Sequence, residues 1–148
     1  MYFHSLDTPA KLNDRLNGIF SYLQGLNVDA VGLNFPIYVD SQGGSAVTTG
    51  EKTPSLAMLR QIIEFAHGRD MKVKLRPSID IVNLGGFWRD ELNALDRKAW
   101  FASYTTTLLP FAELARETGV EEFQVGAYCR LRLTLSRGPG RHFRLAEP

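Results

Sequence analysis

Hydrophobic positions along this chain follow two spacings that replace one another in a regular order. Near the start, apolar side chains recur three or four positions apart, which is typical of one buried helix face: Leu12, Leu16, Ile19, Phe20, Leu23 and Leu26. Asp7 or Thr8 is the expected N-cap, with Pro9 in the first helical position. We therefore expect a helix whose apolar stripe packs on a sheet.

Two later segments repeat the helical spacing. One is expected to begin at Thr53-Pro54 and to end at Gly68, with the stripe Leu56, Leu59, Ile62, Ile63 and Ala66. The other has Asp96 as its expected cap and the stripe Trp100, Phe101, Tyr104, Leu108, Phe111 and Ala115. Pro110 lies inside this last segment and lacks the N–H that a helix interior needs. The helix is therefore expected to bend there or to divide in two.

Each helical segment is followed by a short apolar segment that is typical of a buried strand: residues 30–35, 72–80 and 122–126. In the second of these, Val73 and Leu75 are the apolar alternates, and Pro77 is expected to stop strand pairing. Arg76 and Asp80 would then lie where a loop begins. The alternation of helix and strand predicts an α/β fold with parallel strands.

Candidate binding residues lie near the ends of these strands. The connections 35–53 and 77–96 exceed the roughly 2–6 residues that such turns usually take, and both follow strand ends, where α/β proteins bind ligands. Amide, carboxylate, guanidinium and aromatic groups together suit a sugar, because a ring stacks on its C–H face and its hydroxyls need directional partners. The predicted substrate-binding residues are Asn34, Tyr38, Arg76, Asp80, Trp88 and Arg89.

Each candidate also has a purely structural interpretation. Arg76 and Asp80 could pair with each other or with loop backbone, and Asn34 and Tyr38 could hydrogen-bond within their loop. Trp88 could anchor its loop on the third helix, and the charged pair after it could remain in solvent.

Composition narrows the classes of partner. With 148 residues, 44% of them hydrophobic, and a mean hydropathy of −0.16, the chain suits one globular domain. The 17 basic and 16 acidic residues nearly cancel, so we expect neither nucleic acid nor an anionic membrane as a partner. One cysteine and three scattered histidines predict no internal disulfide, no metal site and no cofactor. We also expect no signal peptide or membrane span in this sequence, and its compartment stays open.

Several segments, taken in order, resemble the N-terminal half of glycoside hydrolase family 113. They are residues 31–38, Thr53-Pro54, residues 74–80, Trp88-Arg89 and residues 123–127. The resemblance covers roughly residues 8 to 127. It implies that residues 1–127 form a partial (β/α)8 TIM barrel and that the substrate is β-linked mannan or a related oligo- or polysaccharide. It also implies retaining hydrolysis by two glutamates, which this family places after strands four and seven.

The same resemblance implies that this chain lacks the catalytic carboxylates. The family's fourth strand ends in a Gly-Thr-Glu-like segment whose glutamate is the acid/base, whereas residues 126–128 read Gly-Ala-Tyr. Tyr128 takes the place of that glutamate and is not expected to function, because a tyrosine hydroxyl ordinarily has a pKa of about 10. Glu121 and Glu122 lie at the start of the strand, at the opposite end from a site. The nucleophile's strand would follow Pro148, so we expect little activity from this chain alone.

The last segment, residues 128–148, has a different character. It holds five arginines, no lysine and a single acid, Glu147. We expect an atypical, disordered tail that arose from an altered reading frame or a spliced end, or else an arginine-rich interaction segment. The remainder amounts to about half a barrel, which leaves open sheet edges through which copies could associate.

Three functions therefore stay open at this point. The first is a glycoside hydrolase-like protein for a β-linked polysaccharide, and the second is a non-catalytic carbohydrate-binding fragment. The third is an unrelated TIM-barrel enzyme that uses Arg76 to bind an anionic substrate.

Overall fold

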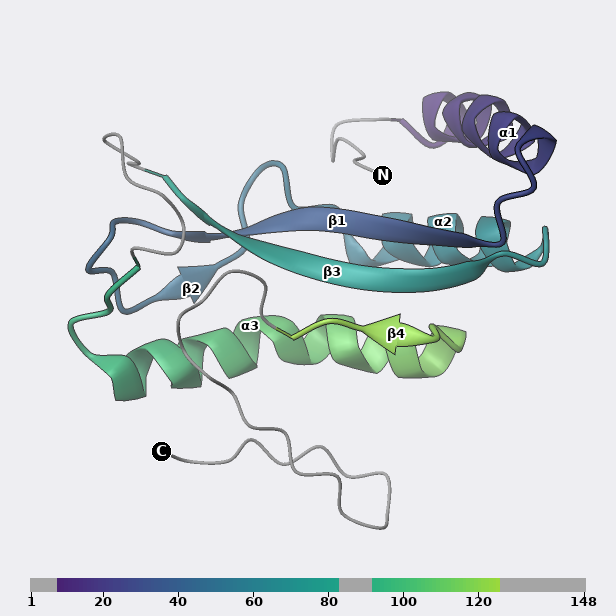
Figure 1. Ribbon diagram of the computed structural model, residues 1–148. Helices are drawn as coiled ribbons and strands as arrows, with labels where there is room; N and C mark the ends of the chain where they lie inside the picture. The colour runs from purple at the N-terminus through teal and green to yellow at the C-terminus, as the bar shows by residue number, and fades with distance from the viewer. Residues whose placement is uncertain (1–7, 83–91, 126–148) are drawn as a thin grey trace, which may run out of the picture.

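The computed structural model describes residues 8–82 and 92–125. In chain order the elements are α1 (Pro9–Gly25), β1 (Ala30–Val39), β2 (Val47–Thr48), α2 (Leu56–His67), β3 (Lys72–Ile81), α3 (Arg97–Thr118) and β4 (Glu122–Phe123). The sheet order is β2-β1-β3-β4, and Figure 1 shows β1 and β3 as its two long strands. β1, β3 and β4 are parallel, which confirms the predicted α/β arrangement. β2 pairs antiparallel with β1 and was not predicted.

The first helix begins as expected. Thr8 is the N-cap of α1, and its hydroxyl accepts the N–H of Lys11 at 3.4 Å. Most of the predicted stripe packs into the core, where the rings of Phe20 and of Phe65 on α2 meet in an edge-to-face arrangement at a centroid distance of 5.3 Å. Leu26 is the exception, because the helix ends at Gly25 and leaves this side chain 56% exposed.

The second helix begins later than predicted. Ser55, not Thr53, caps α2, and its hydroxyl accepts the N–H of Met58 at 3.1 Å. The hydroxyl of Thr53 is engaged elsewhere, since it donates to the carbonyl of Pro36 at 2.7 Å. Thr53-Pro54 therefore belongs to the connection before the helix.

The third helix runs through Pro110 without dividing, so of the two outcomes expected there the division is wrong and the bend stays a prediction. Its cap is Asp96, as expected, with the carboxylate accepting the N–H of Ala99 at 2.9 Å. Buried side chains continue on both sides of the proline, from Trp100 to Ala115. Packing along the whole apolar face outweighs the loss of one backbone hydrogen bond.

Strands β1 and β3 extend past the positions where the sequence predicted them to end. Pro77 does not stop pairing, because its ring nitrogen faces away from the β1–β3 ladder. The N–H of Lys72 donates to the carbonyl of Asp29. The backbone N–H and C=O groups that bond between the two strands therefore belong to the even-numbered residues of β3 and the odd-numbered residues of β1. Pro77 and Pro36 have the opposite parity, so neither needs an N–H there.

All three helices pack on one face of the sheet. The odd-numbered residues of β1 and β3 point to this face and are buried with the helix stripes in one core. The rings of Phe35 on β1 and Phe111 on α3, for example, lie 4.8 Å apart. The even-numbered residues therefore project from the opposite face, where most are exposed or partly buried. We call this second face the open face.

Candidate functional site

The open face carries the predicted binding residues of β1 and β3 in two adjacent pairs. Asn34 is the register partner of Arg76, and Tyr38 is the register partner of Asp80. Partners on neighbouring strands are separated by about 4.8 Å. Two segments far apart in the sequence thus place amide, guanidinium, phenol and carboxylate groups on one continuous surface.

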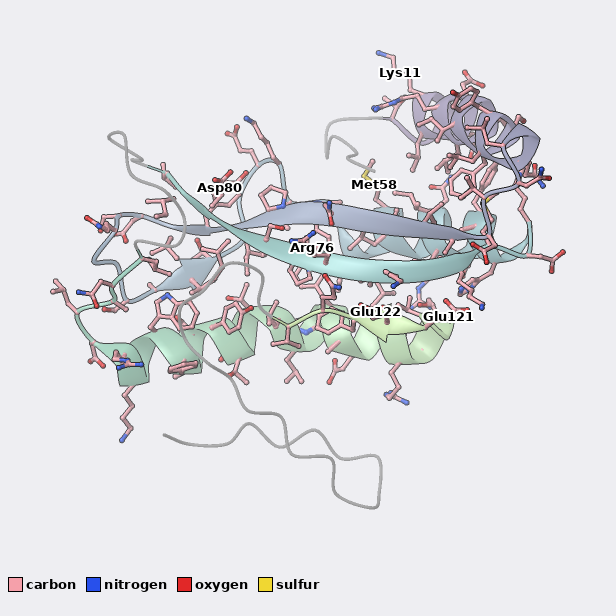
Figure 2. The ribbon with its side chains drawn as sticks, in the orientation of Figure 1. Lys11, Met58, Arg76, Asp80, Glu121 and Glu122 are labelled. Carbon is pink, nitrogen blue, oxygen red and sulfur yellow. The ribbon has the colours of Figure 1, made fainter. Side chains whose placement is uncertain are left out.

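Both pairs lie within the strands, not where loops begin as the sequence suggested. The long β1–β3 ladder runs from Ala30 and Lys72 to Val39 and Ile81, so Arg76 lies near its middle. Asp80 lies toward the C-terminal end of β3, and Figure 2 shows it well separated from the start of β4. The two pairs are offset by four residues, or about 13 Å along the strands, so the surface is elongated.

Sequence reasoning missed other polar residues of the open face. Ser78 is the register partner of Pro36, between the two pairs. Gln124 donates its N–H to the carbonyl of Leu75 at 2.9 Å, which extends the β3–β4 register by one position and places Gln124 beside Arg76. The missed signal was the two-residue period, which assigns every second strand residue to the same face.

At the end of the open face that lies away from Asp80, Glu122 joins β4 to β3. Its carboxylate pairs with Lys74 at 2.6 Å and accepts a hydrogen bond from the side-chain amide of Gln124 at 2.7 Å. The hydrogen bond from Lys74, and then that from Gln124, lower the pKa of Glu122 below its usual value. An acid held in its ionised form is a poor proton donor at neutral pH.

Glu121 points to the helix side of the sheet. It accepts the N–H of Val73 at 2.7 Å and lies 3.4 Å from the imidazole of His67 on α2. Burial raises the pKa of Glu121, but the hydrogen bonds from the Val73 N–H, its own backbone and His67 outweigh burial, and the net pKa is lowered. Neither Glu121 nor Glu122 lies beside Asp80 at the far end of the sheet, where the strands end (Figure 2).

Three predicted site residues, Trp88, Arg89 and Tyr128, lie outside the described residues. The division at residue 127 and the character of the tail also stay predictions. Within residues 8–82 and 92–125, no group of three or more His, Cys, Asp or Glu side chains could hold a metal ion. None of the helices in these ranges is long and apolar enough to cross a membrane.

A separate groove of about 560 Å³ lies at the helix side of the sheet edge. Its walls come from the β2 region, the start of α2 and the middle of α3, including Thr48, Leu56, Thr106 and Phe111. None of the predicted binding residues of β1 and β3 lines it. The groove and the open face are therefore different surfaces.

Comparison with known proteins identifies relatives of this fold. The model of Glycoside Hydrolase Family 113 matches residues 14–137. A solved GH113 beta-1,4-mannanase aligns with a TM-score of 0.68 and 22% identity, over 74% of this chain and 38% of that chain. The GH113 beta-mannanase AaManA from Alicyclobacillus acidocaldarius, solved in complex with ManMIm, aligns with a TM-score of 0.66 and 26% identity, over 74% and 37%. No curated protein matches the chain.

These alignments confirm the predicted partial TIM barrel. The chain spans less than two fifths of the length of the mannanase structures that it matches. In a barrel of this kind the helices form the outer ring, so the open face of the sheet corresponds to the barrel interior.

Proposed function

Because the chain belongs to glycoside hydrolase family 113, we propose that its open face binds a β-linked polysaccharide such as mannan. The observation that carries this proposal is the pairing of Asn34 with Arg76 and of Tyr38 with Asp80 on one surface. The solved relatives are named as beta-1,4-mannanases, which supports mannan as the first polysaccharide to test.

The chemistry of this surface supports a neutral sugar. Arg76 supplies only donors, Asp80 when ionised supplies only acceptors, and Asn34 supplies both. A sugar hydroxyl both donates and accepts, so it can be held by such a mixture. The ring of Tyr38 adds an apolar surface for the C–H face of a pyranose. The elongated arrangement suits a linear oligosaccharide better than a single ring.

We propose further that the chain alone binds this polysaccharide without cleaving it. By its resemblance to the family, the chain has Tyr128 where the acid/base glutamate is expected. Glu121 and Glu122 hold the start of β4. Retaining hydrolysis needs two carboxyl groups about 5–5.5 Å apart across the scissile bond. Self-association through sheet edges stays a prediction.

The test is calorimetric titration of the full 148-residue chain with mannohexaose, accompanied by an assay for new reducing ends. We expect saturable binding without turnover. Arg76→Ala should weaken binding, whereas Arg60→Ala should not, since Arg60 lies on α2 and pairs with Glu117. Release of reducing sugar by the chain would contradict the second proposal.

Binding of an anionic substrate is the competing function, and the same titration decides between an anionic substrate and a neutral sugar. Inorganic phosphate should not compete with mannohexaose if the surface recognises a neutral sugar. Competition by phosphate that is lost in Arg76→Ala, with no binding of mannohexaose, would favour the anionic substrate.

A further inference from the structure

The connection between β2 and α2 contains a turn that is fastened to β1. The N–H of Thr53 donates to the carbonyl of Gly50 at 2.9 Å, which closes the turn. The Thr53 hydroxyl accepts the N–H of Gly50 at 2.9 Å and donates to the carbonyl of Pro36 at 2.7 Å. One side chain therefore stabilises the turn and joins it to the strand that carries Asn34 and Tyr38.

The fastened turn lies directly against the ring of Tyr38. A Cβ atom added to Gly50 would lie 2.7 Å from both Cδ2 and Cε2 of that ring and 3.5 Å from its Cγ. Real Cβ atoms do not approach other atoms so closely, and these ring atoms are not the far end of a flexible chain. Any side chain at position 50 must therefore move either the turn or the Tyr38 ring.

The strand geometry explains why the turn attaches at Pro36. The backbone carbonyl of Pro36 faces away from the β1–β3 ladder, and the antiparallel pairing with β2 involves only Tyr38 and Val39. The Thr53 hydroxyl satisfies this carbonyl at the edge of the sheet. The same bond brings Gly50 to Tyr38, two residues farther along β1.

We infer that Gly50 and Thr53 are positioning residues, which hold the Tyr38 ring in the orientation needed to stack on a sugar unit at the open face. The ring is confined by Gly50 on one side, while Tyr38 as a whole stays partly exposed. This inference rests on the proposed function, because the sugar is the ligand that the ring would contact. The arrangement of the turn itself does not depend on any ligand.

The first experiment examines the ring without a ligand. The full chain is labelled with 3-fluorotyrosine, and the 19F resonance of Tyr38 is assigned with Tyr38→Phe. Gly50→Ala should shift or broaden this resonance, whereas Gly18→Ala should not, because a Cβ at Gly18 meets nothing within 4 Å. Thr53→Val should perturb the Tyr38 signal, whereas Thr53→Ser, which retains the hydroxyl, should leave the signal as it is in the parent chain. An unchanged Tyr38 signal in both Gly50→Ala and Thr53→Val would overturn the inference.

The second experiment tests whether these residues act through Tyr38. Gly50→Ala should weaken mannohexaose binding about two- to tenfold, the range expected when one aromatic contact is lost. In a Tyr38→Ala background, Gly50→Ala should have no further effect. An equal loss of affinity in both backgrounds would overturn the inference.

The two experiments separate the inference from the function on which it rests. If the parent chain does not bind mannohexaose, the proposed function fails. The fluorine signals still decide whether Gly50 and Thr53 fix the orientation of the Tyr38 ring. If the parent chain binds and Gly50→Ala binds equally well, the positioning role fails and the proposed function stands. Circular dichroism spectra of all variants establish that each has folded.

Discussion

Glu121 bonds to both backbone polar groups of Val73. The N–H of Glu121 donates to the carbonyl of Val73 at 3.2 Å, and the Glu121 carboxylate accepts the N–H of Val73 at 2.7 Å. Within the described residues, the ladder between β3 and β4 is short: its register pairs are Lys74 with Glu122 and Leu75 with Phe123, and the hydrogen bond from Gln124 to Leu75 extends it by one position. The carboxylate therefore supplies an additional attachment at the start of β4, the strand that leads toward position 128.

Removal of this carboxylate should destabilise the fold. In Glu121→Ala the buried N–H of Val73 loses its acceptor, which costs about 1–3 kcal/mol, with the lower part of this range expected because the Glu121 side chain is 42% exposed. Urea denaturation measures the change. The control is Glu117→Ala, which removes an ion pair between exposed side chains and should change stability by less than about 1 kcal/mol. Equal stabilities of the two variants would contradict an anchoring role.

The attachment should also depend on pH in one direction. The pKa of Glu121 is below its ordinary value of 4.5 in the folded chain, so its ionised form stabilises the fold above that pH. This contribution is lost as the pH falls below 4.5 and through the lower pKa of the folded state. The stability difference between the parent chain and Glu121→Ala should therefore be constant near neutral pH and should shrink under acidic conditions. A difference that grows as the pH falls would show that the sign is wrong.

The fold was easier to predict from sequence than the site was. Apolar periodicity located the helices, because each stripe packs into a shared core, and helix–strand alternation predicted the parallel strands. The predicted strand ends were wrong, because they were placed at prolines, and Pro77 is compatible with a strand when its nitrogen faces away from the ladder. The partnership of Asn34 with Arg76 depends on register, which no single segment encodes.

Pro110 should limit the stability of α3. It occupies an exposed position inside a continuous helix, where it cannot donate to the carbonyl of Thr106. Pro110→Ala should restore that bond and stabilise the fold by about 1–3 kcal/mol, measured as a higher midpoint of thermal unfolding. Thr105→Ala, at another exposed position of the same helix, changes only helix propensity and should give less than about 1 kcal/mol. A gain from Pro110→Ala no larger than that of the control would mean that the helix has already adapted to its proline.

Two side chains of the same pair on the open face should be coupled in sugar binding, whereas side chains of different pairs should act independently. Asn34 and Arg76 are register partners about 4.8 Å apart, so one sugar hydroxyl bound between them would contact both side chains. Their alanine substitutions should be non-additive in the free energy of mannohexaose binding, by about 0.5 kcal/mol or more. Asn34 and Asp80 are offset by four positions along the strands, or about 13 Å, and their substitutions should add within about 0.5 kcal/mol. Calorimetric titration of the single and double variants measures both cycles. Additivity between Asn34 and Arg76 would mean that the two side chains do not share a sugar unit.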